Sequence, residues 1–273
     1  MTHGVPADRI AMASVGDGGK GGHSNSDGGD AGAKENVTDL FLRLNLTGEE
    51  ETILDFSDDK GETELPQVEW AVVGKVLSPS IVNVSTIHAA MKPTWGNPHG
   101  LKFRVIGAKE NNMFMVEFGS KKEMERIMAG TPWMVDMHAV ILQPYDERLS
   151  VSEIVFNWME IWARILNVPL GWMIQQRGSR AMSLIGDVVK MDVDGDGKSS
   201  GAFLCARMAI DIEKPLRRGV LLRLSRSEEP RWFVVQYEWL PFYCFSCGVL
   251  GHSEIECSDP APRNEIGKLP YDV

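Results

Sequence analysis

The chain has 273 residues, of which 43% are hydrophobic, a composition typical of a globular protein with room for two modest domains. No run of about 18 apolar residues occurs, so we expect no membrane-spanning helix and no membrane partner. The formal charge of −10 does not exclude nucleic-acid binding, because residues 1–66 alone carry −9 of it. Residues 67–149 and 150–241 carry +1 each and residues 242–273 carry −3, so a local basic surface is permitted.

Residues 1–66 are predicted to form a disordered acidic arm and linker. Gly, Asp and Ser dominate up to about residue 36, and such a segment buries too little apolar surface to offset the entropy of ordering it. An apolar island at 40–46 is compatible both with a docking strand and with a short helix. The first residues lack a charged start followed by an apolar core, so we expect no secretory signal.

Residues 67–149 alternate short strands with amphipathic helices. Strands are predicted at 68–77, 101–106, 113–118 and 133–143, and helices at 81–91 and 120–129. Ser120 is expected to cap the second helix. The order β-α-β-β-α-β is that of a ferredoxin-like domain, a plan that RNA-recognition motifs also use. The predicted fold class is therefore α+β with a ferredoxin-like first domain.

The third predicted strand tests this comparison, because RNA-recognition motifs carry stacking aromatic residues on the exposed face of that strand. Met113 and Met115 occupy the two stacking positions, while Phe114 and Phe118 alternate onto the core face. The stacking aromatic residues are therefore missing. Two interpretations stay open: a degenerate motif that serves assembly or weak RNA contact, or a sheet face whose methionines lie under a covering segment.

Residues 150–241 are predicted to form a second, small antiparallel α+β domain. Strands are expected at 157–169, 187–193, 203–212, 219–224 and 231–237, and a helix at 171–185. Cys205 is expected to be a small, buried strand residue.

A basic series occupies the end of this second domain. Its members are Lys214, Arg217, Arg218, Arg223, Arg226 and Arg231. Scattered arginines often form only a solvated face. Here six cations lie within eighteen residues against only two glutamates, which is more than such a face requires. Arginine binds phosphate bidentately and stacks on bases, so Arg217, Arg218, Arg223 and Arg226 are predicted nucleic-acid contacts.

Residues 242–259 contain the spacing C-x2-C-x4-H-x4-C, and residues 260–273 follow as a tail. The four residues of this pattern are Cys244, Cys247, His252 and Cys257. Three thiolates and one imidazole suit a borderline-soft cation, and four protein ligands leave no open position. One structural Zn2+ is therefore the predicted cofactor, and catalysis at this metal is not expected. Gly248 and Gly251 lie where the chain must turn back over the metal.

The segment resembles a CCHC zinc knuckle, the module of retroviral nucleocapsids and retroelement proteins, including the pattern Cys-Phe-x-Cys-Gly-x-x-Gly-His. The run Tyr-Glu-x-Leu-Pro at 237–241 leads into it. Together they are similar to plant gag-like proteins derived from non-LTR retroelements, in which a domain of unknown function precedes this finger.

The resemblance implies a platform for unpaired bases on the knuckle. By position, the residues that would form it are Phe245 and Ile255, with Val249 or Leu250 beside them. The charge departs from the family habit, because Glu254 and Glu256 stand where many knuckles carry Lys or Arg. We therefore expect weak phosphate attraction from the knuckle itself, and any nucleic-acid affinity needs cations from elsewhere.

The sequence predicts zinc-dependent binding of single-stranded RNA or DNA, with RNA favoured because the platform needs unstacked bases. The alternative is an interaction module in which the knuckle docks a protein partner. Self-association is a further expected contact, and no small-molecule substrate is expected. His88, His99 and His138 lie singly, without a nucleophile, base and orienting group together, so we expect no enzyme. Thiols spaced for metal rather than for pairing favour an intracellular location, nuclear or cytoplasmic.

Overall fold

The structure is a computed structural model that describes residues 10–12, 47–54, 70–199 and 201–272. Of these, residues 47–54 belong to one unit, and residues 10–12, 70–199 and 201–272 belong to another. Most of the predicted disordered arm, including the apolar island at 40–46, lies outside the described residues. In the part that is described, no helix is long and apolar enough to cross a membrane.

A short strand corrects the prediction of a disordered arm at three residues. The backbone of β1 (Ile10–Met12) pairs antiparallel with β11 (Arg231–Glu238), where Ile10 lies opposite Glu238. An uncovered strand edge presents unpaired backbone N–H and C=O groups, and a short added strand satisfies them. In the other compact unit, residues 47–54 contain a turn in which the Glu50 carboxylate accepts a hydrogen bond from the Thr47 N–H at 2.7 Å.

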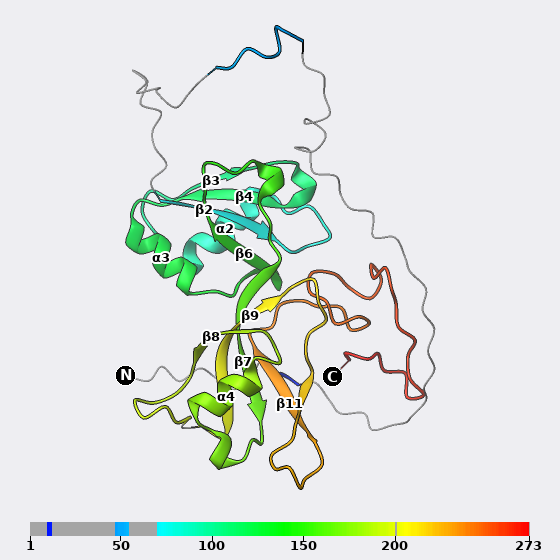
Figure 1. Cartoon of the computed structure of the whole chain (residues 1–273). Helices are drawn as coiled ribbons and strands as arrows, with labels where there is room; N and C mark the ends of the chain where they lie inside the picture. The colour runs from blue at the N-terminus through cyan, green and yellow to red at the C-terminus, as the bar shows by residue number, and fades with distance from the viewer. Residues whose placement is uncertain (1–9, 13–46, 55–69, 200, 273) are drawn as a thin grey trace. The chain divides into compact units, whose positions relative to one another are not determined.

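The first domain has the predicted α+β, ferredoxin-like order. Its elements are β2 (Ala71–Val76), α2 (Val84–Thr94), β3 (Lys102–Val105), the 3-10 turn η1 (Lys109–Asn111), β4 (Met113–Glu117), α3 (Lys121–Ala129), β5 (Trp133–Val135) and β6 (His138–Pro144). The strands form one antiparallel sheet in the order β3-β4-β2-β6-β5 (Figure 1). Without β5, this is the strand order of the βαββαβ unit, so the predicted fold class is confirmed.

The first helix begins later than predicted because a side chain holds the loop that precedes it. α2 starts at Val84 rather than at residue 81. The Asn112 amide donates to the carbonyl oxygens of Ser78 and Ser80, at 3.1 and 2.9 Å, and its oxygen accepts the Val82 N–H at 2.8 Å. These three bonds satisfy the loop backbone in an extended conformation, which competes with helix formation.

A cap and a turn set the boundaries in the second half of this domain. Ser120 caps α3 as predicted, since its hydroxyl accepts a backbone N–H from the first turn at 3.4 Å. The single strand predicted at 133–143 is instead two strands, β5 and β6, joined by a two-residue turn. Asp136 and Met137 form that turn with φ values of 48° and 67°, the conformation that two-residue hairpins require.

The two faces of the first sheet are buried by different partners. One face packs against α2 and α3 in a core of its own. The opposite face contributes Val73, Met113 and Ile141 to a core that also contains strands of the second sheet. Met113 is buried, and Met115 is only 1% exposed. The interpretation that a covering segment hides the methionines is therefore correct for Met113, whereas the Met115 sulfur is covered by the guanidinium of Arg104 on the neighbouring strand β3. Neither methionine offers a free surface for base stacking, although Arg104 itself stays exposed.

The second domain is an antiparallel sheet with one helix. Its elements are η2 (Val151–Glu153), β7 (Trp158–Leu166), η3 (Leu170–Trp172), α4 (Gln175–Met182), β8 (Asp187–Met191), β9 (Phe203–Asp211), β10 (Gly219–Leu222) and β11. The strand order is β1-β11-β7-β9-β8, and β10 pairs with β11 (Figure 1). Cys205 lies buried in β9, as expected.

The helix predicted at 171–185 is shorter than expected. After the 3-10 turn η3, Ile174 is extended and pairs with Lys198 in an isolated antiparallel bridge, so α4 begins only at Gln175. Gly178 then allows close packing of α4 on the sheet, because a Cβ at this position would lie 2.9 Å from the Met191 side chain and 3.0 Å from Leu204.

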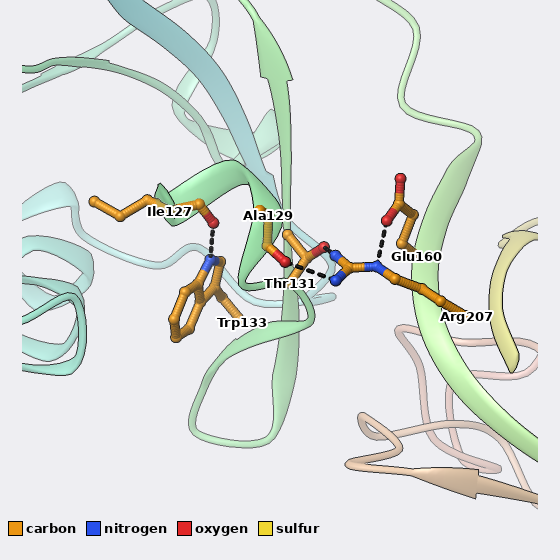
Figure 2. A network of polar contacts seen from close by, with 6 residues as sticks. All are labelled: Ile127, Ala129, Thr131, Trp133, Glu160 and Arg207. Atoms are coloured by element: carbon orange, nitrogen blue, oxygen red, sulfur yellow. Dashed lines mark hydrogen bonds and ion pairs between the residues drawn. The ribbon is translucent and has the colours of Figure 1, made fainter. Parts of the chain in front are cut away.

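Arg207 of β9 joins the two domains. Its guanidinium donates to the Glu160 carboxylate at 2.5 Å, to the Ala129 carbonyl oxygen at 2.6 Å and to the Thr131 hydroxyl at 2.8 Å (Figure 2). Ala129 is the last residue of α3, Thr131 belongs to the loop between α3 and β5, and Glu160 belongs to β7. A planar guanidinium suits three acceptors at fixed angles. Arg207 thus links the second sheet to the loop beside the first.

Candidate metal centre

The structure brings together the four predicted metal ligands. The donor atoms of Cys244, Cys247, His252 and Cys257 all lie within 4.8 Å of one another. Cys247 Sγ lies 3.3 Å from His252 Nε2. A tetrahedral site with metal–sulfur bonds of about 2.3 Å places its sulfur ligands roughly 3.8 Å apart, so small side-chain adjustments are enough to close it. The donor set and its spacing therefore fit a metal ion, and three sulfurs with one imidazole favour zinc.

Backbone geometry explains how so short a loop converges. The Cys244 N–H donates to the Val249 carbonyl oxygen, and the Gly248 N–H donates to the Cys244 carbonyl oxygen, both at 2.8 Å. Gly248 and Gly251 have φ values of 78° and 89°, a region that glycine enters without steric cost. A Cβ on Gly248 would also lie 2.3 Å from the Tyr271 ring. Both glycines thus have the turning role expected of them.

The environments of the ligand thiols differ. Burial is the largest influence on Cys247 and raises the pKa of its thiol to about 11. The hydrogen bond from His252 is the largest influence on Cys257 and lowers its pKa to about 7. A metal ion binds thiolates rather than thiols, so binding here releases protons and weakens in acid.

The segment 242–259, called the knuckle below after the ligand spacing that it shares with that module, has one side in the protein core. The Phe242 N–H donates to the Met137 carbonyl oxygen at 2.8 Å, and the Leu216 N–H donates to the Gly248 carbonyl oxygen at 2.9 Å. Leu250 is buried in the core that contains both sheets. The prediction that Leu250 lies beside the base platform is therefore wrong. Its side chain packs inward, because the knuckle packs against the rest of the protein.

The other predicted platform residues remain accessible. Phe245 is 42% exposed and Ile255 is 91% exposed, while Val249 is half-buried. The Phe245 ring meets the Tyr243 ring edge-on, with centroids 5.2 Å apart. This contact covers part of the Phe245 ring and leaves the rest in solvent. Exposed apolar side chains thus lie on the same loop as the four ligand residues.

The tail folds back onto the knuckle, which the sequence did not indicate. The Tyr271 N–H donates to the Phe245 carbonyl oxygen at 2.9 Å. Arg263 donates to both carboxylate oxygens of Glu254, at 2.9 and 3.0 Å. Glu256 accepts from the Ser253 N–H and hydroxyl, which lowers the pKa of this carboxyl. One of the two acidic residues that set this knuckle apart is therefore paired with an arginine.

The predicted basic residues divide between the two ends of β10. Arg217 and Arg218 precede β10, at the end that the Leu216–Gly248 hydrogen bond ties to the knuckle, whereas Arg223 and Arg226 follow its far end. All four arginines are exposed. Arg218 donates to the Pro270 carbonyl oxygen at 2.5 Å and lies over the Tyr271 ring, 5.1 Å from its centroid. Only Arg217 and Arg218 are thus brought next to the knuckle.

Comparison with known proteins places a named domain in the first half of the chain. A family described as a domain of unknown function (DUF4283) matches residues 66–153. No curated protein sequence matches the chain significantly.

Three solved structures share a weak likeness to the chain, and two of them are described by their RNA-recognition domains. Sex-lethal RNA recognition domains 1 and 2 from Drosophila melanogaster are 11% identical, with 51% of this chain and 85% of that chain covered and a TM-score of 0.24. The first two RRM domains of yeast poly(U) binding protein Pub1 are 10% identical, with 50% and 81% covered and a TM-score of 0.23. The C. elegans NONO-1 homodimer is 12% identical, with 72% and 70% covered and a TM-score of 0.22. The ferredoxin-like assignment therefore rests on strand order and not on these scores.

Proposed function

We propose that this chain, with its DUF4283 domain, is a zinc-dependent nucleic-acid-binding protein of retroelement gag-like type and that its ligand is single-stranded RNA. One observation carries the proposal. Three cysteine sulfurs and one histidine nitrogen converge within 4.8 Å on the same loop that leaves Phe245 and Ile255 in solvent. A metal ion held there would fix that loop, and with it the exposed apolar side chains.

The metal's role in this proposal is structural. Cys244, Cys247, His252 and Cys257 would hold the ion, which supplies free energy of folding to the loop and no reactive position. The chain as a whole is proposed to be non-catalytic and to take no small-molecule substrate. The order of a DUF4283 domain followed by a CCHC knuckle supports the gag-like type, because it matches the plant retroelement arrangement that the sequence resembles.

Base stacking and phosphate contact are the two sources of affinity in this proposal. Stacking of one base on an aromatic ring contributes about 1–3 kcal/mol, and Phe245 offers an accessible ring for it. Only unpaired bases present a free face, which favours a single strand. Arg217 and Arg218 supply cations beside the knuckle, and the Arg263–Glu254 pair reduces the repulsion of phosphate that the sequence led us to expect.

A protein partner for the knuckle is the second candidate function. The observation that favours it is Ile255, which is 91% exposed between two glutamates. An exposed aliphatic side chain with acidic neighbours suits a basic protein surface better than a polyphosphate chain. Self-association belongs to this second candidate, in which a copy of the chain is the partner.

Binding of zinc-loaded protein to a short oligouridylate, followed by fluorescence anisotropy over a salt series, tests the proposal. We expect one zinc per chain by elemental analysis and a steep loss of affinity with salt, because phosphate contacts release counterions. A flat salt response, or no binding, would favour the protein-docking function.

The Phe245→Ala variant tests the stacking role in the same assay. We expect about a 5- to 100-fold loss of RNA affinity with zinc content unchanged, as removal of one stacked base implies. Trp158→Ala is the matched control, because Trp158 is a similarly exposed aromatic residue, at 46%, on β7 outside the knuckle. Equal affinity of Phe245→Ala and the unmodified protein would refute the platform.

A further inference from the structure

A basic groove with an aromatic wall lies next to the knuckle. Its volume is about 630 Å3, within the range of small-molecule sites. The lining includes Lys214, Arg217, Arg218, Leu221, Trp232 and Tyr271, and no acidic residue lines it. Charge therefore favours an anionic occupant, and the aromatic wall favours one with a flat, apolar face.

Trp232, which forms the aromatic wall, lies on the face of the β10–β11 hairpin that does not contribute to the core. It lies opposite Leu221 across the β10–β11 pair, and both side chains are exposed, Trp232 by 44%. Their neighbours on the other face, Val220 and Phe233, are buried. The β10–β11 hairpin thus completes its share of the core with one face and presents an indole and an isobutyl group on the other.

Gly219 lets the indole of Trp232 pack closely against the hairpin. A Cβ at Gly219 would lie 2.4 Å from two ring atoms of Trp232, so only a residue without a side chain permits this position. The indole is thus held against backbone, while Trp232 as a whole stays 44% exposed. An exposed aromatic ring held in place offers a surface on which unpaired bases stack.

The cations of the groove differ in how far they are already engaged. Lys214 pairs with Asp211 at 2.7 Å, and Arg218 is held by the Pro270 carbonyl oxygen and the Tyr271 ring. Arg217 is exposed, and within the described residues no acidic side chain pairs with it. Its guanidinium is therefore the group in the groove that is most available to a phosphate.

Tyr271 connects the groove to the knuckle. Its ring lines the groove and packs against Gly248, while its N–H donates to the carbonyl oxygen of Phe245 at 2.9 Å. Tyr271 thus lines the groove and is hydrogen-bonded to the backbone of Phe245, so the groove and Phe245 are linked through one residue.

We propose that this groove is a second base-binding subsite, in which Trp232 stacks one base of a single-stranded nucleic acid and Arg217 contacts its phosphate. This inference rests on the proposed function, because it places in the groove a neighbouring nucleotide of the strand that binds at Phe245. The footprint of the protein on the strand then spans the knuckle, Tyr271 and the outer face of the β10–β11 hairpin.

Affinity as a function of strand length tests the subsite. The unmodified protein should gain affinity as an oligouridylate is lengthened past the knuckle, and Trp232→Ala should lose about 5- to 100-fold on the long strand only. Trp232→Phe, which keeps a flat ring, should recover most of the loss, and Trp158→Ala should bind like the unmodified protein. Equal affinity of Trp232→Ala and the unmodified protein for the long strand, with Phe245→Ala still impaired, would overturn the subsite and leave the proposed function standing. No RNA binding by the zinc-loaded protein would overturn both.

Two further measurements do not depend on a folded Trp232→Ala variant. Photo-crosslinking of the unmodified protein to an oligonucleotide that carries 5-iodouridine should yield a peptide adduct at Trp232, and adducts confined to residues 244–257 would overturn the subsite. Arg217→Gln changes an exposed side chain and should lower the salt slope of binding by about one phosphate contact. An unchanged slope would remove Arg217 from the subsite.

Discussion

The first sheet and the C-terminal surface differ in what covers them. The sheet face that an RNA-recognition motif would leave open presents Met113 and Met115, and both are buried. The knuckle and the β10–β11 hairpin instead leave Phe245 and Trp232 in solvent, beside cationic side chains. The comparison teaches that a shared strand order does not imply a shared binding surface, because a second domain can convert an open sheet face into core.

The covered face is held by two kinds of contact. Its apolar side chains, among them Val73 and Ile141, join a core with residues of the second sheet. Arg207 then adds two directed hydrogen bonds from the second sheet to Ala129 at the end of α3 and to Thr131 in the loop that follows, while Glu160 of the second sheet holds its guanidinium in place. Hydrophobic burial supplies the attraction and the guanidinium supplies the orientation.

Loss of a metal ligand should have the largest effect of all on the exposed C-terminal surface. In Cys247→Ser we expect zinc content near zero and an RNA affinity lower by about 100-fold or more, because the loop that carries Phe245 loses its folding energy. Elemental analysis and anisotropy measure both. Cys205→Ala is the control and should keep its zinc, since Cys205 lies in β9. Full RNA affinity without zinc would contradict the role assigned to the metal.

Alkylation of the unmodified protein provides a second measurement of the same point. Chelation should make Cys244, Cys247 and Cys257 reactive, because the loop then loses its folding energy and with it the burial that raises the pKa of the Cys247 thiol. Burial raises the pKa of Cys205 to about 12, so its thiolate is scarce at neutral pH and it should stay unreactive before and after chelation. Mass spectrometry of the labelled peptides distinguishes the four sites.

Truncation of the buried Met115 should lower stability and leave RNA binding intact, whereas loss of a metal ligand should greatly lower RNA affinity. We expect Met115→Ala to lower the free energy of unfolding by about 2–5 kcal/mol through the cavity it leaves, with RNA affinity unchanged. Denaturant titration measures the first quantity and anisotropy the second. Val105→Ala, an exposed position on β3, should change neither. A loss of RNA affinity in folded Met115→Ala would mean that the covered face takes part in binding.

Removal of Arg207 should weaken the contact between the first domain and the second sheet. We expect Arg207→Ala to lower the free energy of unfolding by about 1–3 kcal/mol, because Glu160, the Ala129 carbonyl oxygen and the Thr131 hydroxyl lose a charged donor. Arg207→Lys should recover little, since an ammonium cannot satisfy the same three directions. RNA affinity that rises in Arg207→Ala would reveal the sheet face as a second binding surface.

The smallest expected effect concerns the acidic residue of the knuckle. Arg263→Ala should weaken RNA binding by about two- to threefold at low salt, because it frees the Glu254 carboxylate to repel phosphate. Glu254→Gln should strengthen binding by a similar factor. Both effects should fade at high salt, where exposed charges are screened. Opposite signs would indicate that Glu254 contacts the ligand directly.

Much of the fold was predictable because its signals are local. The βαββαβ order follows from hydrophobic periodicity, and Ser120 marked the start of α3. The predicted helix boundaries were wrong where a residue distant in sequence sets the start of the helix. Asn112 delays α2 by holding a loop thirty or more residues away, and the Lys198 bridge shortens the helix expected from residue 171. Side-chain partners of this kind leave no mark on the spacing of the segment that they control.

The candidate site divides in the same way. Four ligands within fourteen residues can meet at one ion whatever the rest of the chain does, so their spacing by itself determined the candidate metal centre and the glycines that turn its loop. Exposure depends on packing between segments far apart in sequence. Only the tertiary structure therefore decided that Met115 and Leu250 are buried, that Arg263 pairs with Glu254, and that Trp232 lies open beside the knuckle.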